Sequence, residues 1–297
     1  MDDRGHLLTE QRLADSMSLD AMSIEQAIQL MYKQDLAAVD AVGSEGGRIA
    51  QAVELISKKL AAGGRLLYFG AGTSGRLGVL DSTECPPTFR IDPQMIQATI
   101  AGGEGAMFRS VEGAEDDAAA GAAAVDEKTA GNADVVFGIA AGGTTPFVHG
   151  ALRRGRELGC ATVFLTCVQA TKDEPAVDIV IRPLVGPEIL TGSTRLKAGT
   201  ATKLVLNTIS TLVMVRLGKV YENLMVDLRA TNSKLWDRGA RIVSTVTGLD
   251  REIAMQLLRE ADGHVKRAIV MHRCGLAATA ADELLARHAG HLRDAIG

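Results

Sequence analysis

The fold is decided by residues 65–76, which read RLLYFGAGTSGR. The apolar run from Leu66 to Phe69 is short, continuous and followed by glycine, which is typical of a strand buried on both faces. The glycines in the second half of the stretch predict a tight turn that leads into a helix. A buried strand, a glycine-rich turn and a helix start indicate the first element of a parallel sheet.

Similar apolar runs occur at residues 96–101, 135–140, 161–166 and 179–185, and helical patterns separate several of them. We therefore predict an α/β fold with a parallel sheet sandwiched by helices. Residues 23–62 read as mostly helical and begin at a capping box formed by Ser23 and Gln26. A long helical pattern from Leu196 to Gly218 precedes an all-helical end of the chain.

This pattern predicts three segments: an N-terminal helical arm over 1–50, a central sheet domain over 51–225, and a small all-helical subdomain over 226–297. In the last segment we expect one buried helical stripe, made of Leu249, Ile253, Leu257, Leu258 and Ala261. The alanine-rich residues 118–124 predict a solvated helix rather than a disordered tract.

Composition excludes several classes of function. The 297 residues carry 32 Lys and Arg against 36 Asp and Glu, a formal net charge of −4, and 3% aromatic residues. Such a chain lacks the basic, stacking surface that single-stranded nucleic acid binding uses, so we expect no nucleic-acid partner. The longest apolar stretch, Leu204–Leu217, is interrupted by polar residues and is too short for a membrane span.

The compartment and the absence of metal are also predicted from residue types. Residues 1–6, MDDRGH, begin with acids where a secretory signal has basic residues, so we expect a cytoplasmic protein. The four cysteines form no C-x-x-C pair, which argues against a disulfide framework and a thiolate metal site. His288 and His291 form an H-x-x-H pattern without accompanying ligands, which indicates a solvated helix end rather than a metal site.

The turn at residues 70–76 is the first candidate binding element. Its backbone amides and the hydroxyls of Thr73 and Ser74 can face an anion at the start of a helix. The turn also matches G-x-G-x-x-G, but a dinucleotide site needs an acid at the end of the next strand. That strand ends in Ala101-Gly102-Gly103, with Glu104 only beyond it. A dinucleotide site and a purely structural turn remain alternatives.

A second loop of the same character spans residues 191–200, TGSTRLKAGT, and opens the long helix. It combines hydroxyls, first-turn amides and cations. If both loops face the C-terminal edge of the sheet, together they can hold a phosphate and sugar hydroxyls. The alternative for Ser193 and Thr194 is ordinary capping of the helix N-terminus.

Two carboxylates are candidates for proton transfer. Glu84 precedes Cys85-Pro86-Pro87, and we expect the prolines to end the helix there. The negative end of a helix disfavours a charged carboxylate, as a proton donor at neutral pH requires. Glu112 and Glu115 lie near the start of another helix, where a surface role that complements the dipole is the simpler interpretation for both.

Five blocks of sequence together resemble one family. They are residues 70–78, residues 81–88 (DSTECPPT), residues 111–116 (VEGAED), residues 191–200, and residues 223–232 (NLMVDLRATN). With these blocks the chain closely resembles the N-acetylmuramic acid 6-phosphate etherases, which belong to the SIS (sugar isomerase) fold family. The resemblance extends in register from about Leu8 to the C-terminus.

The resemblance implies a homodimeric lyase that acts on a sugar phosphate without metal or redox cofactor. It cleaves the D-lactyl ether of N-acetylmuramic acid 6-phosphate, giving N-acetylglucosamine 6-phosphate and D-lactate. By position in the matching motifs, Glu84 is the proton donor and Glu115 the second catalytic residue, plausible as the base at C2. The same matching implies Thr73, Ser74, Gly75, Ser193 and Thr194 as phosphate or hydroxyl ligands, with Lys197 as a nearby cation.

The sequence departs from the SIS pattern after the third strand. Most SIS domains carry a Ser-Gly-x-Thr turn there, whereas this chain has GGTTP at residues 142–146. One expected hydroxyl is therefore missing. Two other functions remain alternatives: an aldose-ketose phosphosugar isomerase, which needs no acid at an ether oxygen, and a non-catalytic sugar-phosphate sensor, which would bind without turnover.

Overall fold

The computed structural model describes Gly5 and residues 7–297. Residues 1–4 and 6, on which the expectation of no secretory signal depends, lie outside the described residues. The chain divides into two compact units. The first comprises the residues up to Thr83 and Pro93–Ser210, and the second comprises Glu84–Asp92 and Thr211–Gly297. The predicted segment boundaries near residues 50 and 225 stay predictions.

The first unit is built on a parallel sheet of five strands, which confirms the predicted α/β class. The strands are β1 (Leu66–Gly70), β2 (Ile96–Ile100), β3 (Val135–Ile139), β4 (Ala161–Leu165) and β5 (Ile179–Ile181). Their order is β2-β1-β3-β4-β5, and every neighbouring pair is parallel. Because β2 and β3 lie on opposite sides of β1, the connections diverge at the carboxyl end of β1, where ligands of open α/β sheets bind.

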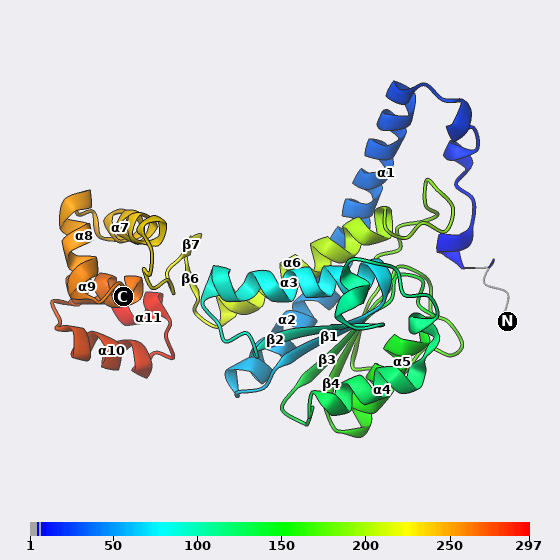
Figure 1. Ribbon diagram of the computed structural model, residues 1–297. Coiled ribbons are helices and arrows are strands. Elements are labelled where there is room, and N and C mark those ends of the chain that lie inside the picture. Colours follow the sequence, from blue (N-terminus) through cyan, green and yellow to red (C-terminus); the bar gives the residue numbers. More distant parts are fainter. Residues whose placement is uncertain (1–4, 6) are drawn as a thin grey trace. The chain divides into compact units, whose positions relative to one another are not determined.

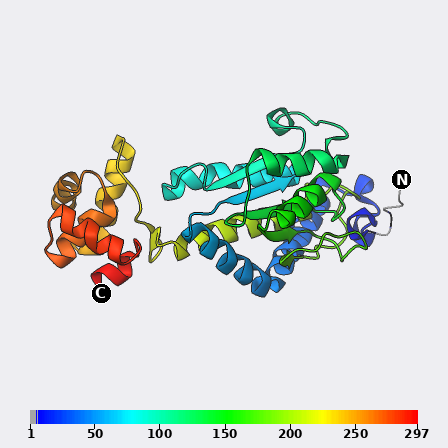
Figure 2. The same cartoon turned by 90° about the horizontal axis from the view of Figure 1, so that it is seen from below.

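Helices cover both faces of this sheet (Figure 1). One face carries α4 (Ala118–Glu127) and α5 (Pro146–Glu157). The other carries α3 (Gly72–Phe89) and α6 (Lys197–Arg216), with α1 (Ile24–Ser44) and α2 (Gly46–Ala61) beside them. In Figure 2, seen from below, α5 in green lies in front of the sheet. Short 3-10 turns complete the unit at Leu8–Glu10, Ala14–Ser16, Leu19–Ala21, Glu104–Met107 and Ala114–Asp116.

The predicted capping box at the start of α1 is confirmed. The Gln26 amide donates to the Ser23 hydroxyl, and the Ser23 amide donates to the Gln26 side chain. The alanine-rich helix α4, by contrast, is not solvated on all sides. A Cβ at Gly121 would lie 1.9 Å from the carbonyl oxygen of Phe147 in α5, and one at Gly150 equally close to that of Ala118. Small residues therefore let α4 and α5 touch backbone to backbone.

Asp81 ties the other helical layer to the sheet. The hydroxyl of Tyr68 in β1 donates to Asp81 Oδ2 at 3.1 Å. From α6, the Asn207 amide and the Ser210 hydroxyl both donate to Asp81 Oδ1, at 2.8 and 2.9 Å. A buried carboxylate is stable only when hydrogen bonds replace its hydration, and here the donors come from β1 and α6 while Asp81 is on α3.

α6 has the length and composition of a membrane-spanning helix. Its most apolar window has a mean hydropathy of 1.3, and half of that window is buried inside the structure. Ala198, Ala201, Val205 and Ile209 are completely buried. Asn207 and Ser210, which interrupt the apolar stretch, are the residues that bind Asp81. These contacts are those of a core helix of the first unit.

The second unit has a helical end, as predicted. Its elements are β6 (Val220–Tyr221), β7 (Leu224–Met225), α7 (Ser233–Thr247), α8 (Arg251–Glu260), α9 (Val265–Cys274), α10 (Ala278–Arg287) and α11 (Leu292–Ile296). The predicted stripe on α8 is partly wrong. Ala254, Leu258 and Ala261 are buried, but Ile253 is 52% exposed. The buried face of α8 passes through position 254 instead, because that face packs on α7 and α9.

We predict that the Arg65–Asp134 ion pair at the start of β1 contributes strongly to stability. Burial alone would raise the pKa of Asp134, but hydrogen bonds from Arg65 and the Gly131 amide lower it overall. Asp134→Asn should therefore lower the free energy of unfolding by about 2–4 kcal/mol at neutral pH. Since the pKa of Asp134 is lower in the folded state than in the unfolded state, the loss should begin to shrink as pH falls below about 4 and should disappear only below the folded-state pKa.

Urea unfolding followed by circular dichroism measures this effect. Asp15→Asn is the matched control, because Asp15 pairs with Lys33 in the open, with side chains 48% and 71% exposed. That change should cost less than about 1 kcal/mol. Equal losses in the two variants, or a loss at Asp134 that does not depend on pH, would contradict the prediction.

Candidate functional site

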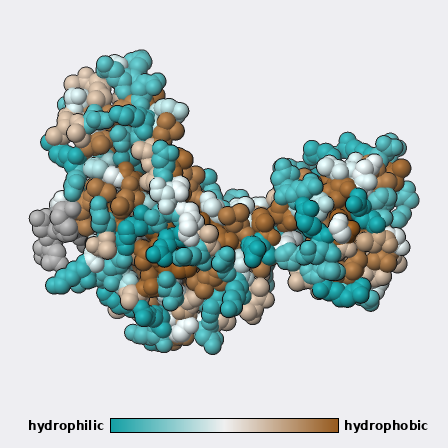
Figure 3. Space-filling model, turned by 180° about the vertical axis from the view of Figure 1, so that it is seen from behind, coloured by the Kyte–Doolittle hydropathy of each residue, from teal (hydrophilic) through white to brown (hydrophobic). Residues whose placement is uncertain are grey.

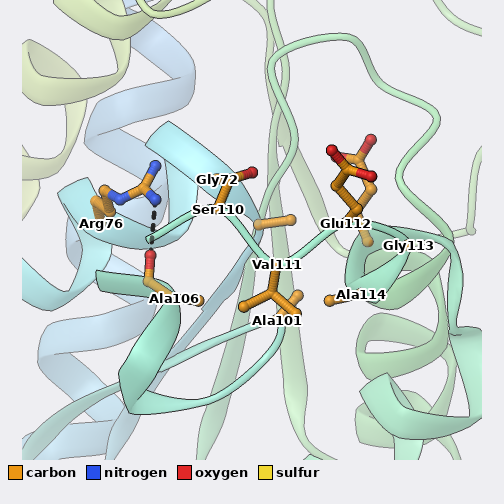
Figure 4. Close-up of a pocket in the computed structure, with 11 residues that line it drawn as sticks. Gly72, Arg76, Ala101, Ala106, Ser110, Val111, Glu112, Gly113 and Ala114 are labelled. Carbon is orange, nitrogen blue, oxygen red and sulfur yellow. Dashed lines mark hydrogen bonds between the residues drawn. The ribbon is translucent and has the colours of Figure 1, made fainter. Parts of the chain in front are cut away.

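A cavity of about 250 Å³ lies at the carboxyl ends of β1 and β2 (Figure 4). Its wall comes from the start of α3, the end of β2 and the loop that follows β2. The lining residues are Ala71, Gly72, Arg76, Ala101, Ala106, Ser110, Val111, Glu112, Gly113, Ala114 and Glu115. The glycine-rich turn therefore does border a cavity, at the edge of the sheet where the sequence predicts binding.

Arg76 gives this cavity a positive side. Its guanidinium donates from Nε to the Met107 carbonyl at 3.0 Å and from Nη2 to the Ala106 carbonyl at 2.7 Å. Both partners are neutral, so these bonds orient the cation without cancelling its charge. The N-terminus of α3 at Gly72 lines the same cavity and adds the positive end of a helix dipole. The combination favours an anion.

Glu115 and Glu112 lie on the wall of this cavity. Gly113, with φ of +74°, turns the chain between them, so that Glu115 falls in the 3-10 turn Ala114–Asp116. Figure 4 shows Arg76 on one side of the cavity and Glu112 on the other, with Gly72 and Ser110 between them. Glu112 was expected on an uninvolved surface. It is solvent-exposed, yet it borders the cavity as Glu115 does.

Glu84 is not among the residues that line this cavity. It is exposed on α3 and belongs to the second unit. The prediction that Pro86 and Pro87 end the helix is wrong: α3 continues through both to Phe89. Each proline lacks an amide donor and crowds the preceding turn, but its carbonyl still accepts, and the Arg90 amide donates to that of Pro86 at 2.9 Å. Glu84 therefore sits inside the helix, and the argument from a helix end does not apply to it.

The two predicted binding loops come together. A Cβ at Gly199, in the first turn of α6, would lie 3.6 Å from Cγ2 of Thr73. Ser74 is buried, whereas Thr73 is half-buried. None of Thr73, Ser74 and Gly75 lines the cavity described above, although Gly72 and Arg76 on either side of them do. The start of α3 thus faces the start of α6.

Gly75 has a packing role. A Cβ there would lie 2.8 Å from the carbonyl oxygen of Gly70 and 2.6 Å from Cγ1 of Ile100. Such distances are too short for any side chain. The helix can therefore approach β1 and β2 this closely only with glycine at position 75.

The first amides of α6 are occupied by a residue that sequence reasoning missed. Glu188 is completely buried, and its carboxylate accepts from the amides of Lys197 and Ala198 at 2.9 and 3.0 Å. Burial raises the pKa of Glu188, while these two amides oppose the rise. Glu188, rather than Ser193 or Thr194, caps these amides. Its place nine residues before the helix start gave no capping signal in the sequence.

Lys197, the expected nearby cation, is buried. Its exposed fraction is 2%, and its ammonium donates to the side-chain oxygen of Gln34 in α1 at 2.8 Å. Burial lowers the pKa of Lys197, and the carboxylates of Glu188 and Asp35 counteract this. The observed contact of Lys197 is therefore a bridge between α6 and α1.

A buried histidine supports the loop at residues 142–146, where the SIS turn is altered. His149 of α5 is 6% exposed, and its Nε2 donates to the Gly143 carbonyl at 2.8 Å. Burial lowers the pKa of His149, so the ring is neutral at physiological pH. Gly143 has φ of +72°, a conformation that glycine adopts readily. The hydrogen bond holds this unusual loop at the end of β3.

We predict that Glu188 stabilises the start of α6. Glu188→Ala leaves two buried amides unpaired and should lower the free energy of unfolding by about 2–4 kcal/mol. Glu188→Gln keeps one acceptor oxygen and should lose less. Asp117→Ala removes the exposed cap of α4, which accepts from Ala120 at 2.8 Å, and as a control should cost about 1 kcal/mol. Urea unfolding that ranks the Asp117 variant below the Glu188→Ala variant would refute the capping role.

Comparison with known proteins agrees with the observed fold. Residues 48–156 match the family model of the glucokinase regulatory protein N-terminal SIS domain. A solved structure from Bacteroides fragilis, assigned as a phosphosugar isomerase involved in capsule formation, matches with a TM-score of 0.51 at 16% identity, covering 68% of this chain and 95% of that chain. At this identity the match shows the fold alone.

Curated relatives match the full length. The N-acetylmuramic acid 6-phosphate etherase of a Nostoc species is 53% identical over 296 residues, which is 100% of this chain and 96% of the relative. The enzyme of the same name from a Synechocystis species is 51% identical, over 100% of this chain and 97% of the relative. The chain therefore belongs to the N-acetylmuramic acid 6-phosphate etherase family.

Proposed function

We propose that this protein is a carbon–oxygen lyase that cleaves the D-lactyl ether of N-acetylmuramic acid 6-phosphate. The products are N-acetylglucosamine 6-phosphate and D-lactate, and the reaction belongs to the recycling of cell-wall amino sugars. The observation that carries the proposal is the full-length likeness to etherases of that name. The cavity supports it, because it joins an arginine and a helix N-terminus to Glu115.

The proposed chemistry is elimination followed by hydration. In the open-chain sugar the C1 aldehyde acidifies the proton on C2, so a carboxylate base can remove it. The C3–O bond then breaks, an acid protonates the departing lactate oxygen, and a double bond forms between C2 and C3. Water adds across that bond, with its hydroxyl at C3 and its proton at C2. We assign Glu115 as the C2 base and Glu84 as the acid.

The phosphate is proposed to bind where the starts of α3 and α6 meet. Thr73, Ser74 and Gly75 would supply hydroxyls and amides from α3, and Ser193 and Thr194 would do so from the loop before α6. The closeness of Thr73 to Gly199 supports this arrangement. Lys197, the first residue of α6, is a buried cation. Because Glu188 already binds two amides of α6, the hydroxyls of this loop carry more of the proposed binding.

We further propose a cytoplasmic homodimer. α1 exposes large apolar residues on one side, a stripe made of Ile24, Ile28, Met31, Tyr32, Leu36 and Val39, each between 40% and 76% exposed. Apolar surface, in brown, is also visible over the first unit in Figure 3. A stripe at helical spacing without a partner is typical of a surface that another copy covers.

The proposed function is tested by incubating the protein with N-acetylmuramic acid 6-phosphate and assaying D-lactate. We expect release of lactate together with N-acetylglucosamine 6-phosphate. Conversion of a ketose phosphate without lactate would instead establish an isomerase, and tight binding without turnover would establish a sensor. Either result with folded protein would end the etherase proposal.

The division of labour between the two glutamates gives a second test. Glu84→Gln should slow lactate release roughly 10²–10⁴-fold while solvent deuterium still enters at C2, because base and acid act on different atoms. Glu115→Gln should suppress both lactate release and deuterium exchange. Glu112→Gln, a neighbouring carboxylate on the same cavity wall, is the control and should retain most activity. Full etherase activity of the Glu84 variant would refute the assignment.

Subunit mixing tests how the two carboxylates meet. Glu115 lines the cavity and Glu84 does not, so we propose that each active site uses Glu115 of one protomer and Glu84 of its partner. Mixed dimers of Glu84→Gln and Glu115→Gln chains then contain one intact site and should recover activity that neither variant has alone. Absence of recovery in verified mixed dimers would show that both carboxylates come from one chain.

The stripe on α1 gives a prediction for assembly. Tyr32→Glu places a charge at a residue that is 62% exposed in the single chain, and should shift the protein from dimer to monomer because the charge would be desolvated at the interface. Lys33→Glu introduces the same residue one position away from the stripe and should leave the dimer intact. Sedimentation velocity distinguishes the two. A monomeric wild type, or two variants that behave alike, would contradict the proposal.

A further inference from the structure

A second cavity lies entirely within the helical unit. Its volume is about 250 Å³, and its residues come from the segment 217–228, the start of α9, the end of α10 and Arg90. None of these residues lines the cavity that contains Glu115. Its wall carries more cations than carboxylates, with Arg90, Lys219, Lys266 and Arg267 facing Asp227 and Asp282.

Two lysines share one carboxylate in this cavity. Lys266 Nζ lies 3.3 Å from Asp227 Oδ1, and Lys219 binds Oδ2 of the same residue. Lys266 is 8% exposed, so it is a buried ammonium and not a surface lysine. One carboxylate cancels one of the two charges. The pair therefore leaves a net positive charge beside the cavity.

The two arginines differ in their pairing. Arg267 binds Asp282 with two parallel hydrogen bonds, at 2.9 and 2.7 Å, and is thereby neutralised. Arg90 instead donates from Nη1 to His264 Nδ1 at 3.2 Å. Within the described part of the chain Arg90 makes no ion pair with a carboxylate. Its charge adds to that left by the lysines.

The N-terminus of α9 also makes the cavity positive. Val265, Lys266 and Arg267 are its first three residues and all line the cavity, and the preceding His264 makes no side-chain cap. The positive end of this ten-residue helix therefore faces the cavity. Helix N-termini of this kind bind anions when cationic side chains accompany them.

The pKa shifts of the neighbouring groups have the direction that a positive potential causes. Burial lowers the pKa of His264, and Arg267, Arg90 and Arg229 lower it further, opposed by Asp262. Burial also lowers the pKa of Lys266; the nearby Lys219 adds to this, while Asp227 opposes it. A dianion in the cavity would relieve the repulsion among these cations.

We propose that this cavity is a binding site for a phosphate dianion, carried by inorganic phosphate or by a phosphate monoester. Arg90, Lys219 and Lys266 would bind its oxygens together with the amides of Lys266 and Arg267, whereas the Val265 amide already donates to the Leu228 carbonyl at 3.1 Å. Charge-assisted hydrogen bonds from ammonium, guanidinium and helix amides are the usual means of phosphate recognition. The proposal does not depend on the proposed function, because it uses different residues and a different ligand test.

The experiment follows the His264 ring in the full-length protein by NMR, with labelled histidine and assignment through His264→Gln. Inorganic phosphate is titrated at constant ionic strength against sodium chloride. We expect saturable movement of the His264 signals and a rise in the pKa of His264, because a nearby anion stabilises the charged ring. N-acetylglucosamine 6-phosphate and N-acetylglucosamine are titrated in the same way. The phosphate ester should shift the His264 signals if the cavity accepts monoesters, and the sugar without phosphate should not shift them.

Three variants decide the proposal. Arg90→Gln, at an exposed residue, and Lys266→Met should each weaken the phosphate response roughly tenfold, the loss expected for one charge-assisted hydrogen bond. Arg229→Gln is the matched control: it removes a cation that also acts on His264 but does not line the cavity, so the phosphate response should persist. No saturable shift in the wild type, or equal weakening in all three variants, would overturn the proposal. Arg90→Gln keeps the test decisive if Lys266→Met does not fold.

Discussion

The contact between Gly75 and Gly70 is the constraint on which the rest of the site depends. With the Gly75 Cα against the end of β1, α3 begins so close to the sheet that no side chain fits between them. That closeness fixes the direction of α3, and with it the positions of Gly72 and Arg76 on the cavity wall. A hydrophobic side chain at position 75 would open the interface and displace the cation that gives the cavity its charge.

Buried carboxylates hold the other elements in place. Asp81 joins α3, β1 and α6, Glu188 caps α6, and Asp134 binds Arg65 at the start of β1. Each is hydrogen-bonded to donors from elsewhere in the chain, as a buried charge requires. In a sheet domain whose candidate binding loops contain many glycines, these polar contacts supply positional precision that apolar packing alone does not.

The candidate site was predictable in part. The glycine-rich turn and the loop before α6 stand out because their residue types are unusual for ordinary turns, whereas Glu115 is singled out only by the family resemblance. Arg76 and Glu188 were missed, since an arginine on a helix and an acid in a loop are unremarkable until their partners are known. The expectation for Pro86 failed because a helix accepts proline wherever the lost amide bonds are offset by packing, here with Cys85 and Phe89 buried.

Residue pattern alone specified the parallel sheet, the helical end and the family, because apolar periodicity and rare motifs are local properties of the chain. Tertiary structure decided which charges are buried and which meet. In the folded chain Lys197 donates to Gln34, Asp227 binds two lysines, and Arg90 donates to His264. The reason is physical: the electrostatic state of a side chain depends on neighbours distant in sequence, and no local pattern encodes their approach.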